Sequence, residues 1–107
     1  MKVAIIGLGV VGLRRKIFID KNNFVKLTAI SDIKFKENFF TRNKVHYYRN
    51  YNDLINNENL DAVFITLPNY LAVKVTIICL KKNLHVFCEK PPARSLSEIR
   101  KVKKIKL

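Results

Sequence analysis

Short apolar runs alternate with longer amphipathic or polar segments along the whole chain. The runs have the length of buried strands, and the segments between them repeat apolar residues at helical spacing. The predicted strands are Lys2–Ile6, Val25–Ile30, Val45–Tyr48, Ala62–Ile65 and Leu84–Cys88. The predicted helices are Val10–Lys21, Lys34–Arg42, Tyr51–Ile55, Leu71–Lys82 and a last one, capped by Ser95 or Ser97, that runs to the end of the sequence.

This alternation of strands and helices predicts the fold class. Strands joined through helices pair in parallel and are covered on both faces, so we expect an α/β fold with a doubly wound parallel sheet. Right-handed crossovers place the five strands in the order 3-2-1-4-5. We expect residues 1–107 to form one domain. Asn22 and Asn23 are expected to end the first helix in the left-handed conformation.

All three glycines lie within the first twelve residues, as Gly7, Gly9 and Gly12 in a G-x-G-x-x-G spacing between the first strand and the first helix. This context is typical of dinucleotide binding. Gly7 would allow the turn out of the strand, Gly9 would let the backbone approach a pyrophosphate, and Gly12 would let the helix pack closely. The alternative is a glycine turn with no ligand. The predicted site also includes Leu8, Val10 and Val11.

An acidic residue, Asp32, follows the second apolar run about twenty residues after Gly12. A carboxylate at this place accepts a hydrogen bond from the ribose 2′-hydroxyl of NAD and repels the 2′-phosphate of NADP. The alternative role is the N-cap of a helix that begins near Lys34, and both roles can hold together. The sequence therefore predicts NAD in preference to NADP, although Lys34 and Lys36 are close enough to blunt that preference.

The three prolines mark the same predicted edge of the sheet. Pro68, Pro91 and Pro92 each come just after the carboxyl end of a predicted strand. Doubly wound sheets bind their ligands at that edge, and proline stiffens the loops there.

Composition narrows the class of protein. Hydrophobic residues make up 49% of the chain, which excludes a disordered protein, and no apolar run has the length of a membrane span. We expect no signal peptide and a cytoplasmic protein. Cys79 and Cys88 stand inside apolar runs and are expected to be buried free thiols. His46 and His85 are isolated in the sequence, so we expect no metal site.

The formal net charge of +13 invites a nucleic-acid-binding hypothesis. However, lysine and arginine are spread through every polar segment, and the richest patch, residues 100–106, has the pattern of the solvated face of an amphipathic helix. Nucleic-acid binding is therefore disfavoured. The positive field would still attract anionic cofactors and substrates.

Four segments together resemble one known family. They are Ile6–Gly12, Ser31–Asp32, Thr66–Asn69 and His85–Pro91, in order and at similar spacing to the Gfo/Idh/MocA oxidoreductases, the glucose–fructose oxidoreductase and inositol dehydrogenase relatives. The resemblance implies a Rossmann domain and NAD(P)-dependent hydride transfer at a hydroxyl-bearing carbon of a sugar, cyclitol or derivative. It adds the loop after the fourth predicted strand to the cofactor site: Thr66, Leu67, Pro68 and Asn69.

The same resemblance implies roles for the Glu-Lys-Pro segment. Glu89 would contact the ribose next to the nicotinamide, Lys90 would hydrogen-bond the reacting hydroxyl, and Pro91 would fix the turn. A cis Lys90–Pro91 bond would suit such a turn, although trans is the commoner state. A lysine at a strand end beside a cofactor is a plausible proton-transfer partner. The alternative for Lys90 is a surface lysine in a proline-kinked loop.

The chain departs from the family pattern at two positions and in length. Ala72 stands where many members have histidine, and Asn83 stands where glycine is usual. The family normally continues to a sixth strand and a substrate domain, which we expect to be absent from this chain. We therefore expect a cofactor domain that is inactive alone. The family resemblance is compatible with the formation of a homo-oligomer. Two alternatives are a non-catalytic NAD(H)-binding regulatory module and, disfavoured by the Glu-Lys-Pro segment, a Rossmann-like methyltransferase.

Overall fold

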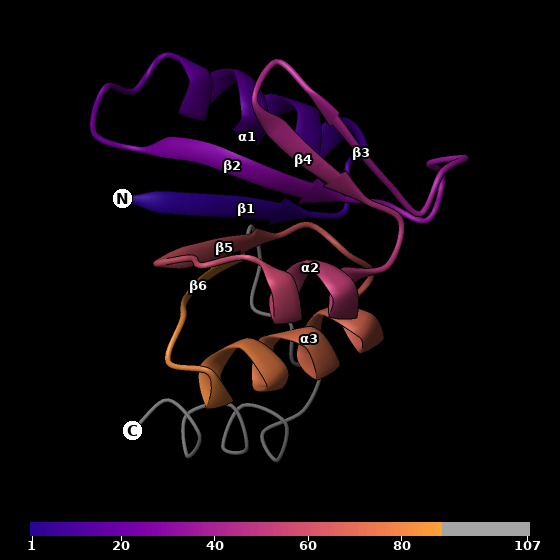
Figure 1. Ribbon diagram of the computed structural model, residues 1–107. Coiled ribbons are helices and arrows are strands. Elements are labelled where there is room, and N and C mark those ends of the chain that lie inside the picture. Colours follow the sequence, from indigo (N-terminus) through magenta and orange to yellow (C-terminus); the bar gives the residue numbers. More distant parts are fainter. Residues whose placement is uncertain (89–107) are drawn as a thin grey trace.

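Within residues 1–88, six strands form one twisted sheet in the order β3-β4-β2-β1-β5-β6 (Figure 1). The computed structural model describes residues 1–88. Its elements in chain order are β1 (Lys2–Ile6), α1 (Val10–Asp20), β2 (Lys26–Ser31), β3 (Phe39–Arg42), β4 (Val45–Tyr48), α2 (Tyr51–Asn57), β5 (Ala62–Ile65), α3 (Asn69–Lys81) and β6 (His85–Cys88). The predicted last helix and the Glu-Lys-Pro segment lie outside the described residues.

The five predicted strands are confirmed, with ends that differ by at most a residue or two. They are β1, β2, β4, β5 and β6, they pair in parallel, and they follow the predicted order. β1 lies between β2 and β5, where the direction of winding reverses. Figure 1 shows α1 on one side of the sheet and α2 and α3 on the other. The prediction of a doubly wound α/β sheet therefore holds.

The predicted helix over Lys34–Arg42 is wrong. This segment turns and then forms β3, an antiparallel edge strand that pairs Phe40 with Tyr47 of β4. Asn43 and Lys44 form the tight connection with positive φ values of 52° and 66°, as a two-residue hairpin turn requires. The rings of Phe40 and Tyr47 stack with centroids 4.6 Å apart, so a cross-strand aromatic pair stabilises the hairpin.

The end of α1 also differs from the prediction. The helix ends at Asp20, and its C-cap residue Lys21 keeps a right-handed conformation. Asn22 has no positive φ; its side-chain oxygen instead accepts a hydrogen bond from the Phe24 N–H at 2.8 Å. Asn83, after α3, does adopt the left-handed conformation, with φ at 62°. Asn83 therefore takes the left-handed conformation that was expected of asparagine at this position.

Two apolar clusters cover the two faces of the sheet. One lies under α1 and includes Val3, Ile5 and Ile19. The other lies against α2 and α3 and includes Ile6 and Val75. Because successive residues of a strand point to opposite faces, β1 supplies both clusters and is buried on both sides. The central strand is therefore a continuous apolar run.

Two polar side chains fix β1 toward its amino end. Asp61 accepts a hydrogen bond from the Lys2 N–H through Oδ2 at 2.7 Å. The Thr28 hydroxyl donates to the Val3 carbonyl at 3.3 Å. These contacts lie away from the carboxyl edge, so they offer matched controls for polar contacts at that edge.

Of the two cysteines, Cys79 is fully buried as predicted, whereas Cys88 is only partly buried because it lies on the edge strand β6. Burial raises the pKa of the Cys79 thiol to about 12. The folded state thus favours the protonated thiol, so this contribution to stability is complete below about pH 9 and is lost as the pH rises toward 12.

We expect the free energy of unfolding of the native chain to fall with pH in that window, with Cys79 contributing about 1.4 kcal/mol per pH unit. Cys79→Ala should show a shallower slope. The measurement is urea unfolding at several pH values between about 8 and 10.5. Because other groups titrate equally in both proteins, the difference in slope isolates the thiol. Equal slopes would contradict the prediction.

Candidate functional site

A cleft of about 420 Å³ lies at the carboxyl edge of the sheet, where β1, β2 and β5 end. It is lined by Ile6, Gly7, Leu8, Gly9, Ser31, Asp32, Ile33, Lys34, Arg49, Tyr51, Thr66, Leu67, Pro68, Tyr70 and Leu71. In doubly wound sheets this edge, beside the point where the strand order reverses, binds ligands. The cleft thus combines the turn after β1, the turn after β2 and the loop after β5.

The predicted site residues divide into three groups. Those that line the cleft are Gly7, Leu8, Gly9, Asp32, Thr66, Leu67 and Pro68. Val11 and Gly12, in the first turn of α1, are not among the lining residues. Val10 and Asn69 are the first residues of α1 and α3. Glu89, Lys90 and Pro91 lie outside the described residues. The structure therefore brings together segments that are more than 50 residues apart in the sequence.

The three glycines have three different environments. Gly7 has φ at +95°, a conformation that favours glycine. A Cβ on Gly12 would overlap the carbonyl oxygen of Gly7, so α1 packs directly against the turn. A Cβ on Gly9 would have no neighbour within 4 Å in the described part of the chain, which leaves the space beside this residue open. Gly7 and Gly12 thus serve the backbone packing, and Gly9 borders free space in the cleft.

The N-terminus of α1 points its first N–H groups to this edge of the sheet. Gly9 is the N-cap residue and has no side chain that could cap the helix. The first turn of α1 contains no acidic residue. Helix N-termini carry exposed donors and a partial positive charge that favours anions. The loop is therefore suited to an anionic group.

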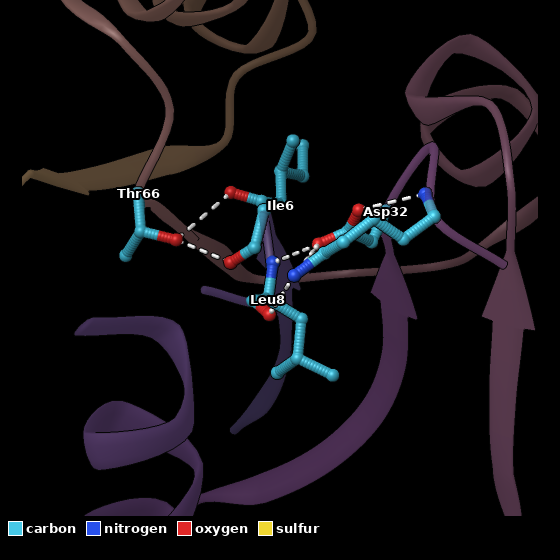
Figure 2. A network of polar contacts seen from close by, with 6 residues as sticks. Ile6, Leu8, Asp32 and Thr66 are labelled. Carbon is cyan, nitrogen blue, oxygen red and sulfur yellow. Dashed lines mark hydrogen bonds and ion pairs between the residues drawn. The ribbon is translucent and has the colours of Figure 1, made fainter. Parts of the chain in front are cut away.

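Asp32 holds the turn after β2 against the glycine turn. Its Oδ2 accepts a hydrogen bond from the Leu8 N–H at 2.8 Å, and its Oδ1 accepts one from the Lys34 N–H at 2.9 Å (Figure 2). The predicted alternative, in which Asp32 is the N-cap of a helix, is wrong, because no helix follows; the side chain caps a turn at Lys34 instead. The Asp32 side chain is 8% exposed, so part of the carboxylate still faces the cleft.

A lysine ammonium group adds positive charge beside this carboxylate. Lys34 Nζ lies 3.8 Å from Asp32 Oδ2 and donates to the Leu8 carbonyl at 3.3 Å. Its side chain is mostly exposed. Any anion that enters this side of the cleft would thus meet both charges.

Thr66 connects the end of β5 to the glycine turn. Its N–H donates to the Ile6 carbonyl at 3.0 Å, and its Oγ1 lies in hydrogen-bond contact with the Gly7 carbonyl and 3.4 Å from the Ile6 carbonyl (Figure 2). The threonine side chain therefore reaches across from one strand to the turn after its neighbour.

Sequence reasoning missed several lining residues. Ile33 and Tyr70 are 80% and 70% exposed and give the cleft apolar walls. Arg49 follows the carboxyl end of β4 and brings a second cation to the cleft. The edge rule that selected the prolines could have found Arg49, because it comes directly after a predicted strand. Tyr70 follows the predicted loop by one residue.

A polar cluster on the α2 side of the sheet was also missed. His46 Nδ1 lies 2.8 Å from Glu58 Oε2, and the Tyr48 hydroxyl donates to the same oxygen. Burial and this hydrogen bond raise the pKa of the Tyr48 hydroxyl above its usual range. His46 and Tyr48 alternate on β4 and therefore share a face, but their partner follows α2, which spacing along the strand does not show.

Among residues 1–88, no three His, Cys, Asp or Glu side chains come together in a way that would hold a metal ion. No helix of the described part of the chain has both the length and the apolar character that crossing a bilayer requires.

Comparison with known proteins identifies relatives over almost the whole chain. The model of an oxidoreductase family with an NAD-binding Rossmann fold, Gfo/Idh/MocA, matches residues 1–106. Inositol 2-dehydrogenase of Salmonella typhimurium is 31% identical over 95% of the chain and 32% of its own length. Myo-inositol 2-dehydrogenase of Thermotoga maritima is 30% identical over 92% of the chain and 30% of its own length.

A solved structure agrees with these sequence relatives. Myo-inositol 2-dehydrogenase from Lactobacillus plantarum superposes with a TM-score of 0.79 at 32% identity, over 98% of this chain and 32% of that one. The chain therefore spans about a third of the length of the relatives it matches. With its glycine turn, Asp32 and a parallel sheet in the expected order, the chain belongs to the Gfo/Idh/MocA oxidoreductase family and corresponds to the NAD-binding Rossmann domain of that family.

Proposed function

We propose that this chain binds NAD(H) in preference to NADP(H). The observation that carries the proposal is the position of Asp32, whose carboxylate lies at the end of β2, lines the cleft and is joined to the glycine turn by the Leu8 N–H. A carboxylate at that place can accept hydrogen bonds from ribose hydroxyls and repels a 2′-phosphate. Lys34 and Arg49 line the same cleft and reduce that repulsion, so we expect a preference rather than exclusion.

The residues beside Asp32 fit the remainder of a dinucleotide. The space next to Gly9 is open, and the first N–H groups of α1 border it, which suits a pyrophosphate. Ile33 and Tyr70 offer apolar surface to the planar rings of the dinucleotide. The loop of Thr66, Leu67 and Pro68 closes the cleft on the β5 side. Val10, Val11 and Asn69 would contribute through the first turns of their helices.

The second part of the proposal is the activity that this chain would have when it is joined to a substrate domain. The relatives are named as inositol dehydrogenases, which supports an oxidoreductase that acts on a hydroxyl group of a sugar or cyclitol. A bound nicotinamide would supply the hydride chemistry. We assign Glu89 to the adjoining ribose, Lys90 to the reacting hydroxyl and Pro91 to the turn. In a form of the chain joined to a substrate domain, Lys90→Ala is expected to lower the turnover number; an unchanged value would remove that role.

We also propose a domain organisation and a cellular compartment for the chain. Residues 1–107 would form one dinucleotide-binding domain that turns over no substrate alone, in the cytoplasm, where free thiols such as Cys79 persist. A homo-oligomer is compatible with this proposal. The alternative function is a regulatory NAD(H)-binding module, which would bind the dinucleotide in the same cleft but would not need Lys90.

Calorimetric titration with NADH and NADPH tests the first part of the proposal. We expect both to bind and NADH to bind about tenfold more tightly, which corresponds to about 1.4 kcal/mol. S-adenosylmethionine serves as the control ligand, because it has an adenosine but no pyrophosphate, and we expect no heat of binding. Tighter binding of NADPH would contradict the role of Asp32, and absence of binding by either dinucleotide would contradict the proposed function.

A further inference from the structure

The peptide group between Gly7 and Leu8 is held at both ends by side chains from other strands. Its N–H donates to Asp32 Oδ2 at 2.8 Å, and its carbonyl oxygen lies in hydrogen-bond contact with Thr66 Oγ1. Figure 2 shows Thr66 on one side of the turn and Asp32 on the other. The two side chains come from the ends of β5 and β2, which flank β1 in the sheet. The glycine turn is therefore clamped from both neighbouring strands.

The turn has little of its own to fix the orientation of this peptide. Gly7 has φ at +95° and no side chain, so its conformation depends on its neighbours. Thr66 Oγ1 lies 3.0 Å from the place that a Cβ on Gly7 would take and 3.2 Å from the place of a Cβ on Gly12. The hydroxyl thus fills the space that the two glycines leave free. It also lies where α1 packs on the turn.

The direction of the hydrogen bond follows from the available proton. A threonine hydroxyl has one proton to donate, and carbonyl oxygens only accept. The Ile6 carbonyl already accepts the Thr66 N–H at 3.0 Å and is 3.4 Å from Oγ1. The Gly7 carbonyl is the nearer acceptor. The hydroxyl proton therefore goes to Gly7.

We propose that Thr66 is a positioning residue for the dinucleotide site. It acts through the Gly7 carbonyl, fixing the Gly7–Leu8 peptide so that Leu8 N–H meets Asp32 and the next residue, Gly9, presents its open side to the ligand. Thr66 also lines the cleft, but this role does not require it to touch the ligand. The inference rests on the proposed function, since it assigns a part of the same binding site.

The test compares three variants of the full chain by NADH titration. Thr66→Val keeps the branched shape and removes the donor, and we expect the dissociation constant to rise about tenfold. Thr66→Ser restores the donor, so its dissociation constant should stay within about twofold of the native value. Thr28→Val is the matched control, because it likewise removes a threonine hydroxyl that donates to a backbone carbonyl, that of Val3 in β1, away from the cleft. We expect it to bind NADH as the native chain does.

A second measurement separates positioning from simple loss of stability. Hydrogen exchange of the Leu8 amide should speed up in Thr66→Val but not in Thr28→Val, because only the former releases the Gly7–Leu8 peptide. Equal losses of NADH affinity in both valine variants, or native affinity and native Leu8 exchange in Thr66→Val, would overturn the inference. If the native chain binds no NADH, the proposed function fails, and the exchange rate of Leu8 still decides whether Thr66 fixes the peptide.

Discussion

Replacing Gly12 with alanine is expected to lower the free energy of unfolding by about 3 kcal/mol and the midpoint of thermal unfolding by roughly 15 °C. The added Cβ would overlap the carbonyl oxygen of Gly7, which belongs to the backbone and cannot move aside as a flexible side chain would. Either α1 shifts away from the turn or the clamp at Gly7 opens. Circular dichroism during heating measures the effect, and NADH affinity should fall as well.

Gly9→Ala is the matched control for Gly12→Ala. Gly9 has φ at −89°, which alanine adopts easily, and its Cβ would meet no atom of residues 1–88 described by the structure within 4 Å. We expect the midpoint of thermal unfolding to stay within about 2 °C of the native value, since surface changes of this kind have small effects. NADH should nevertheless bind about tenfold more weakly, because the Cβ enters the space proposed for the pyrophosphate. Unchanged affinity in Gly9→Ala would move the pyrophosphate elsewhere in the cleft.

Asp32→Ala is expected to raise the dissociation constant of NADH about a hundredfold, equivalent to about 2.7 kcal/mol, and to abolish the preference for NADH over NADPH. The change removes a proposed acceptor for the ribose and also the acceptor of the Leu8 N–H, so the site loses a contact and part of its support. NADPH should lose less affinity, because the carboxylate no longer opposes its 2′-phosphate while Lys34 remains. Titration of the variant with both dinucleotides measures the two effects.

Asp61→Ala provides the comparison for Asp32→Ala. Asp61 likewise accepts a hydrogen bond from a backbone N–H, that of Lys2, but it does so at the amino end of β1. This variant should lose some stability and keep both the NADH affinity and the preference. If the two alanine variants changed dinucleotide binding alike, Asp32 would be a structural residue and the ribose assignment would be wrong.

The sequence pattern was sufficient to predict the parallel strands of the sheet and their order. Strands such as β1 and β5 are short apolar runs bounded by polar turns, and the crossover rule then leaves one order for them. The edge rule likewise predicted that the glycine turn and Pro68 lie at one edge of the sheet, where both line the cleft. These predictions succeeded because each depends on local composition or on a general rule of chain topology.

The parts that failed depend on contacts between distant residues. The pattern of Lys34–Arg42 predicts a helix, whereas in the structure Phe40 pairs with Tyr47, which lies outside the segment, and their rings stack. The bond from Thr66 to the Gly7 carbonyl joins residues 59 positions apart. No spacing rule indicates which hydroxyl will donate to which carbonyl, so the clamp on the glycine turn is visible only in the structure.

The edge strand β3 has a consequence for solubility. Without it, β4 would present its own unpaired N–H and C=O groups at this end of the sheet, a template on which another chain could add a strand. β3 covers that edge with four residues, among them the exposed Thr41 and the cationic Arg42. Short, charged edges resist intermolecular strand pairing. Resistance to aggregation at this end of the molecule therefore depends on a strand for which the sequence pattern alone predicts a helix.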